Sequence, residues 1–248
     1  MTDPIIVLAT TLVFFLAGAV KGVIGLGLPT VSLGLMTAIM DLPTAMTLML
    51  APTFVTNVLQ ATTGGYTVVL LRRIWPFLFF ATVLVWPGGL VLRQADLSLM
   101  SAFLGVVLAA YALTGFFGVR MTTRPERERG IGVATGAVNG VLSGMVGSYA
   151  VPGVMYLQSL ELPRDQFVQA MGMLFLCTTI ALGVTLSGTN LMSLDMGFAS
   201  VLAVVPAILG FYAGQHIRKK LSESLFRTLF YVALLVLGAF IAAKALLF

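Results

Sequence analysis

Long apolar runs follow one another along almost the whole chain, with only short polar loops between them. A transmembrane helix needs about 20 apolar residues to cross the hydrocarbon core. Charged residues make up 9% of the chain, whereas a soluble domain carries about 25%, so this chain cannot cover a water-facing surface. The pattern predicts an all-α integral membrane protein with about 8–10 membrane segments. The runs cover about residues 4–20, 22–40, 42–63, 74–92, 98–119, 130–144, 146–160, 166–187, 196–214 and 225–247.

The two halves of the chain repeat each other. Gly18 and Gly136 open similar glycine-rich stretches, Asp41-Leu-Pro matches Glu161-Leu-Pro, and Leu97-Ser matches Leu221-Ser, at spacings of 118, 120 and 124 residues. A drift of this kind is typical of a duplicated unit with loop insertions. We predict a first membrane repeat over 1–119, a basic cytoplasmic linker over 120–129 and a second membrane repeat over 130–248. Each repeat would be a Gly/Pro-broken, re-entrant-like helix pair followed by three transmembrane helices.

Basic residues set the orientation of the segments. They cluster in a few short loops, around Arg72-Arg73, between Arg120 and Arg129, and at Arg218-Lys-Lys. Cytoplasmic loops carry the excess of Lys and Arg, so these loops are predicted to face the cytoplasm. The runs 42–63 and 166–187 then cross in opposite directions. The prediction is therefore two inverted-topology repeats, with both termini on the periplasmic side.

The two broken segments are the predicted substrate site. The first is Gly18–Pro29, and the second runs from Gly136 through Gly144 and Gly147 to Pro152. Paired Gly/Pro-interrupted segments at matching places mark the binding site of many transporters, and the positive ends of half-helices favour an anion. The alternative is that these glycines only let helices pack closely. Two copies in matching places favour the site.

Lys21 is the charged residue of the first broken segment, and its repeat partner is the neutral Asn139. A lysine deep in the membrane is a functional residue by default and would neutralise an anion. A lysine at the end of the run 4–20 would instead extend to the interface. The sequence supports these two interpretations equally.

Polar side chains near the breaks complete the candidate site. Thr53, Asn57 and Gln60 form one helical stripe, opposite a run with Gln169, Thr178 and Thr179. They would bind the oxygens of an anion or make interhelical hydrogen bonds, and the first is slightly favoured. The residues predicted to bind substrate are Lys21, Gly25, Gly27, Thr30, Asn57, Asn139, Ser143, Gly144, Gly147 and Ser148.

Other classes of function have little support. The net charge of +5 is explained by the cytoplasmic basic loops, so no nucleic-acid partner is expected. The sequence has no Walker motif, HExxH, CxxC or nucleophile–histidine pair. We therefore expect no enzymatic activity, no catalytic residues, no metal site and no cofactor.

The chain resembles the sulfite exporter TauE/SafE family, also called the 4-toluene sulfonate uptake permeases. The tail from Leu209-Gly-Phe-Tyr to Leu-Ser-Glu223, continuing to Phe230, is similar to the family's tail signature, and both broken segments resemble its glycine-rich motif. Two departures are Lys21 and the pair Ser148-Tyr149, which stands where glycines are common. The resemblance implies a multi-pass transporter of small sulfur-containing anions in the bacterial inner membrane.

The sequence therefore predicts a secondary transporter for sulfite, sulfoacetate or organosulfonates. Export is the favoured direction of transport. The anion would bind at the midplane between the broken helices, and transport would proceed by alternating access. An anion channel and a structural or assembly subunit of a membrane complex are the alternatives. The expected partners are a small anionic substrate and the lipid bilayer, with a homo-oligomer left open.

Overall fold

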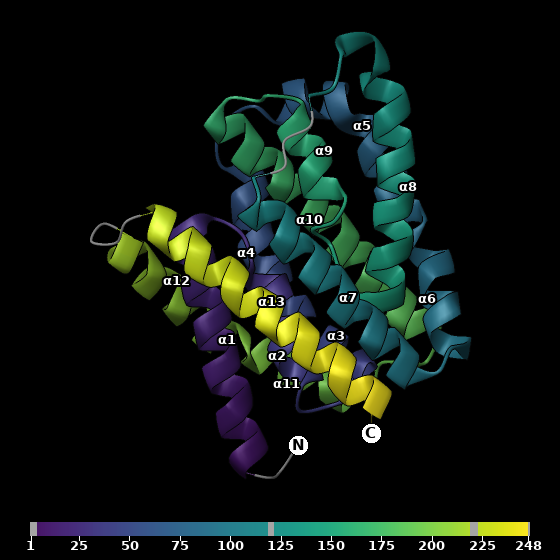
Figure 1. Cartoon of the computed structure of the whole chain (residues 1–248), viewed down its shortest axis with the longest axis vertical. Coiled ribbons are helices and arrows are strands. Elements are labelled where there is room, and N and C mark those ends of the chain that lie inside the picture. The colour runs from purple at the N-terminus through teal and green to yellow at the C-terminus, as the bar shows by residue number, and fades with distance from the viewer. Residues whose placement is uncertain (1–3, 119–121, 219–222, 248) are drawn as a thin grey trace. The chain divides into compact units, whose positions relative to one another are not determined.

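The computed structural model describes residues 4–118, 122–218 and 223–247, and these residues form helices and no strand (Figure 1). This confirms the all-α prediction. Arg120, Lys219, Lys220 and the Leu221-Ser222 repeat match lie outside the described residues. The helices are α1 (Pro4–Ile24), α2 (Leu28–Thr37), α3 (Leu42–Leu48), α4 (Leu50–Thr62), α5 (Thr67–Val83), α6 (Val85–Gln94), α7 (Leu97–Phe116), α8 (Glu128–Val146), α9 (Gly153–Ser159), α10 (Arg164–Gly188), α11 (Leu194–Leu202), α12 (Val204–Arg218) and α13 (Glu223–Leu247), with a 3₁₀ turn at Pro125–Arg127.

Four of these helices, and the consecutive pairs α5 with α6 and α11 with α12, are long and apolar enough to cross a membrane. Within the described residues, six segments pass that test, and α3 with α4 adds a seventh if this pair, bent by 42°, is one span. The protein is therefore a multi-pass membrane protein. The shorter α2 and α9 each follow a break in the chain. The six segments are Pro4–Ile24, Thr67–Gln94, Leu97–Phe116, Arg164–Gly188, Leu194–Ile217 and Leu225–Leu247.

Three of the interruptions between helices follow one rule for proline. A proline ring clashes with the carbonyl four residues earlier and removes a hydrogen bond there. Pro52, Pro87 and Pro206 lie four residues after Leu48, Val83 and Leu202, the last residues of α3, α5 and α11. At the first of these kinks, Ser200 Oγ donates to Leu48 O at 2.9 Å and accepts from Ala51 N at 3.0 Å. The side chain thus satisfies backbone groups that a membrane would leave unpaired.

The chain packs as two compact units, and each unit takes helices from both halves of the sequence. Unit 1 comprises Met1–Pro52, Asp96–Gly118 and Asn190–Phe248, and unit 2 comprises Thr53–Ala95 and Val119–Thr189. The boundary predicted at 120–129 concerns repetition in the sequence and stays a prediction. The two units are instead defined by packing, because within each unit helices from the two halves of the sequence bury their faces against one another.

In unit 1, α1 packs along α12 through glycines on both helices. A Cβ at Gly18 or Gly22 would overlap the carbonyl oxygen of Ala207 or Phe211, and the glycines of α12 meet the backbone of α1 in the same way. Small residues of this kind let two helix backbones approach closely in a membrane. Gly18 and Gly22 therefore belong to a continuous helix, and the prediction that the chain is broken throughout Gly18–Pro29 is wrong at these positions.

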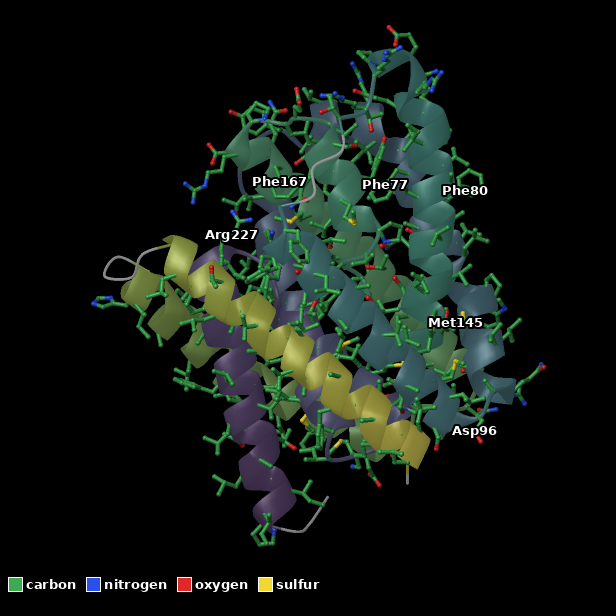
Figure 2. All side chains as sticks on the ribbon, in the orientation of Figure 1. Phe77, Phe80, Asp96, Met145, Phe167 and Arg227 are labelled. Carbon is green, nitrogen blue, oxygen red and sulfur yellow. The ribbon has the colours of Figure 1, made fainter. Side chains whose placement is uncertain are left out.

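Unit 2 is built in the same way around α8. A Cβ at Gly136, Gly140 or Gly144 would overlap backbone oxygens of α5 and α6. Phe77 and Phe80, which contribute two of these contacts, are labelled beside α8 in Figure 2. α10 packs against α5, α6 and α9 to complete the unit. The stretch Gly136–Gly144 is thus helical, and the break predicted there lies a few residues later.

Candidate anion-binding breaks

The first break is the three-residue segment between α1 and α2. Gly25 and Gly27 have φ of +81° and +106°, a region that residues with a Cβ rarely adopt. Gly25 N donates to Lys21 O at 2.7 Å and closes α1, and Val31 N donates to Gly27 O at 2.8 Å and opens α2. A Cβ at Gly25 would meet no atom within 4 Å. The backbone there can be approached closely.

The start of α2 carries unused donors. Gly27 is its N-cap residue, and no side chain caps it. The first amides of a helix have no acceptor within the helix, and Pro29, in this first turn, has no N–H at all. Leu28 and Thr30 therefore present amides that only a partner from outside the helix can satisfy. This end of α2 also carries the positive end of its dipole.

A cation lies in the last turn of α1, seven residues before this helix start. Lys21 is on α1, not between two runs as its place in the sequence suggested, and its side chain is 2% exposed. Its side chain is therefore packed inside the protein and is not exposed at the protein surface. Among the side chains described in residues 4–118, 122–217 and 225–247, no other Lys or Arg is buried. Burial of a charge is costly without compensation, so this position is a functional candidate.

The second break, between α8 and α9, has a different construction. Gly147 ends α8 with φ of +70°, and residues 147–152 lead to α9. Asn139 Oδ1 accepts from Gly153 N at 2.9 Å and so caps the start of α9. Ser143 Oγ lies 2.7 Å from Asn139 O and 3.1 Å from Ser148 O. Two residues predicted to bind substrate thus hold this segment together.

The polar stripe on α4 divides into two parts. Thr53 and Asn57 are buried, whereas Gln60 Nε2 donates to Val168 O at 2.9 Å. Gln169 Nε2 donates to Ala61 O, and its Oε1 accepts from Tyr66 N at 3.0 Å. Gln60 and Gln169 therefore tie α10 to the end of α4 and the following turn. These two residues therefore make the interhelical hydrogen bonds that were one of the two roles predicted for the polar stripe.

The candidate residues fall into two groups. Unit 1 contains Lys21, Gly25, Gly27 and Thr30, which are close in sequence around one break. Unit 2 contains Asn57, Asn139, Ser143, Gly144, Gly147 and Ser148. Within the described part of the chain, no group of three or more His, Cys, Asp or Glu side chains could hold a metal ion.

Comparison with known proteins gives one family. A family model described as "Sulfite exporter TauE/SafE" matches residues 10–241 of the 248. No match was found among curated proteins or among solved structures. The family match includes both breaks and nearly the whole chain. The chain therefore belongs to the sulfite exporter TauE/SafE family.

Proposed function

We propose that this protein is a secondary transporter that exports small sulfur-containing oxyanions, such as sulfite, sulfoacetate or organosulfonates. It would lie in the bacterial inner membrane with both termini periplasmic, and it would work by alternating access of two inverted repeats. Its family and its six long apolar helices support a membrane transporter of sulfite or sulfonate type. The substrate range, the direction of transport and the transport mechanism are what we propose beyond this.

The first break is the observation that carries the proposal. α2 begins with no side-chain cap, and Lys21 is buried on the adjoining end of α1. Helix N-termini bind anions through their free amides and their dipole, and an ammonium group strengthens each hydrogen bond to an oxyanion. We assign direct contacts with the anion to Lys21, to the backbone at Gly25 and Gly27, and to the Thr30 hydroxyl.

The second break has a supporting role in this proposal. Asn139 and Ser143 use their polar atoms within the segment, and Gly144 packs against α6. These residues, with Gly147, would fix the shape of the break, and the hydroxyl of Ser148 would be the group that meets substrate. Asn57 on α4 would form part of the polar lining of the transport pathway.

The membrane potential supplies the driving force for export. An interior-negative potential of 100 mV is worth about 2.3 kcal/mol per charge, which sustains an anion gradient of about 50-fold. The buried polar side chains of the described residues include no Asp or Glu. A proton-coupling carboxylate is thus not among them, and export without a coupled ion accounts for this composition.

Flux in proteoliposomes tests the proposal. We expect labelled sulfite or sulfoacetate to leave vesicles faster when a potassium diffusion gradient makes the interior negative, with no pH gradient applied. Exchange of labelled for unlabelled anion should saturate, as a carrier requires and a channel does not. Flux indifferent to potential would contradict uncoupled export. A complete lack of flux with every anion, together with a stably co-purified partner, would favour an assembly subunit.

A further inference from the structure

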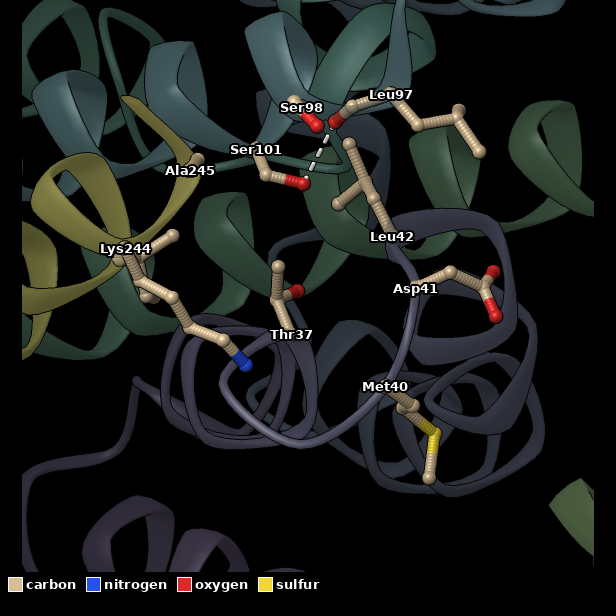
Figure 3. Close-up of a pocket in the computed structure, with 10 residues that line it drawn as sticks. Thr37, Met40, Asp41, Leu42, Leu97, Ser98, Ser101, Lys244 and Ala245 are labelled. Atoms are coloured by element: carbon tan, nitrogen blue, oxygen red, sulfur yellow. Dashed lines mark hydrogen bonds between the residues drawn. The ribbon is translucent and has the colours of Figure 1, made fainter. Parts of the chain in front are cut away.

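A cavity of about 280 Å³ lies in unit 1, at the C-terminal end of α2, the opposite end from the first break (Figure 3). Four helix ends form it: the C-terminal ends of α2 and α13 and the N-terminal ends of α3 and α7. Exposed Lys244 and Ser98 stand on its wall, so the cavity is open to the surroundings. Because α7 and α13 are membrane-spanning segments, their ends place it at the boundary of the membrane.

Hydrogen-bond donors gather on one wall. Lys244 Nζ donates to Ala38 O at 2.9 Å, which uses one of the three donors of its ammonium group. Thr37 also lines the cavity and is 7% exposed, and its Oγ1 has no hydrogen-bond partner in the part of the chain that the structure describes. A buried hydroxyl without a partner requires an explanation. Ser98 adds a further hydroxyl to this wall.

A single water molecule does not account for the cavity. Water occupies about 30 Å³ in the liquid, and the cavity is several times larger. Apolar side chains also line it, among them Leu42 and Ile241, which are both buried. The arrangement therefore matches a ligand with a polar head and an apolar part.

Nearby carboxylates limit the charge of such a ligand. Asp41 lines the cavity, but its oxygens accept from Thr44 N at 2.9 Å and Thr44 Oγ1 at 2.8 Å, and Figure 3 shows its carboxylate turned away from Lys244. Asp96 caps α7 and accepts from Ser98 N at 2.7 Å. The helix amides are therefore already occupied. Lys244 can neutralise one negative charge, and the two carboxylates disfavour a ligand of higher negative charge.

We infer that this cavity binds a monoanionic oxyanion head group attached to an apolar chain, with Lys244 and Thr37 as its donors. Alkylsulfonates and phosphodiester lipids share this chemistry. The inference is independent of the proposed transport site, because no residue of the first break lines the cavity.

Binding to the full-length protein in a non-ionic detergent tests the inference. The probes are 1-hexanesulfonate and dihexanoyl phosphatidylglycerol, with methanesulfonate as a head group without a chain, and titration calorimetry gives the affinities. We expect at least one of the chain-bearing probes to bind saturably and more tightly than methanesulfonate. The stronger of the two identifies the source, a free sulfonate or a membrane lipid.

Two variants connect binding to the named donors. Lys244→Gln keeps an N–H for Ala38 O but removes the charge, and it should weaken binding about 10-fold or more. Thr37→Val keeps the shape and removes the hydroxyl, and it should weaken binding several-fold. Arg93→Gln, which removes an exposed cation of α6 in unit 2, should leave binding unchanged. The inference is overturned if neither chain-bearing probe binds, if Lys244→Gln and Thr37→Val both bind like the wild type, or if Arg93→Gln weakens binding as much as Lys244→Gln.

Discussion

The two breaks share a plan and differ in what holds them together. Each follows a helix that packs through glycines, turns at a glycine with positive φ and leads into a short helix. In the second break, Asn139 caps the new helix through Gly153 N. In the first, no side chain caps α2, and the residue matching Asn139 in the sequence repeat is the buried Lys21.

This difference separates a structural role from a binding role. A capped and hydrogen-bonded segment is stable without a ligand, since its donors and acceptors are satisfied. The first break has uncapped amides at the start of α2 and the buried Lys21 in the last turn of α1, and we propose that an anion binds there. Changes at the second break should therefore reduce stability, whereas changes at the first should reduce transport. Exchange of the two repeat partners makes this contrast testable.

The largest effect is expected from Asn139→Lys. The change removes the cap on α9 and places a charge in a buried site without a partner, and an uncompensated buried charge costs about 3–5 kcal/mol. We expect the variant to unfold at a much lower temperature in detergent, or to fail to fold. Asn139→Ala, which removes only the hydrogen bonds, should lose about 1–3 kcal/mol. Equal stability of both variants and the wild type would contradict a structural role for Asn139.

The reciprocal change, Lys21→Asn, is expected to act on transport. Loss of a charged hydrogen-bond donor to an anion costs about 1.5–3 kcal/mol, so initial flux at low substrate concentration should fall about 10- to 150-fold. Thermal stability should be kept, because the variant removes a buried charge.

Arg93→Gln is the matched control for this change in net charge. Arg93 is an exposed cation in the last turn of α6, and its loss should leave flux near the wild-type value. A similar loss of flux in both variants would assign the effect to the overall charge of the protein and not to Lys21.

The membrane-spanning helices were predictable from local sequence. Apolar runs define the spans because the bilayer imposes a length on each helix. The interruptions after Leu48, Val83 and Leu202 each come four residues before a proline, but Pro76 lies inside α5 without interrupting it, so this rule alone does not predict them. Lys244 gave a signal that the sequence interpretation passed over, a cation inside an apolar run, as Lys21 is.

The exact breaks and the role of Asn139 could not be predicted from local sequence. Gly18 and Gly22 stay helical because α12, nearly 190 residues later, packs against them. The hydrogen bond from Gly153 N to Asn139 could not be predicted because Gly153 lies beyond a loop whose path the sequence does not specify. Both outcomes depend on contacts between segments, and periodicity carries no information about them.

The smallest effect, and the sharpest test of the first break, comes from a pair of glycines. Gly25 and Gly65 have φ of +81° and +80°, and a Cβ at either would meet no atom within 4 Å. Gly→Ala should therefore cost both variants the same backbone strain, about 1–2 kcal/mol, measured as equal shifts in thermal unfolding. Only Gly25→Ala changes the backbone assigned to the anion, so it alone should raise the KM for transport several-fold. If Gly65→Ala raised the KM equally, strain anywhere in the protein would explain the loss, and the first break would have no special place in binding.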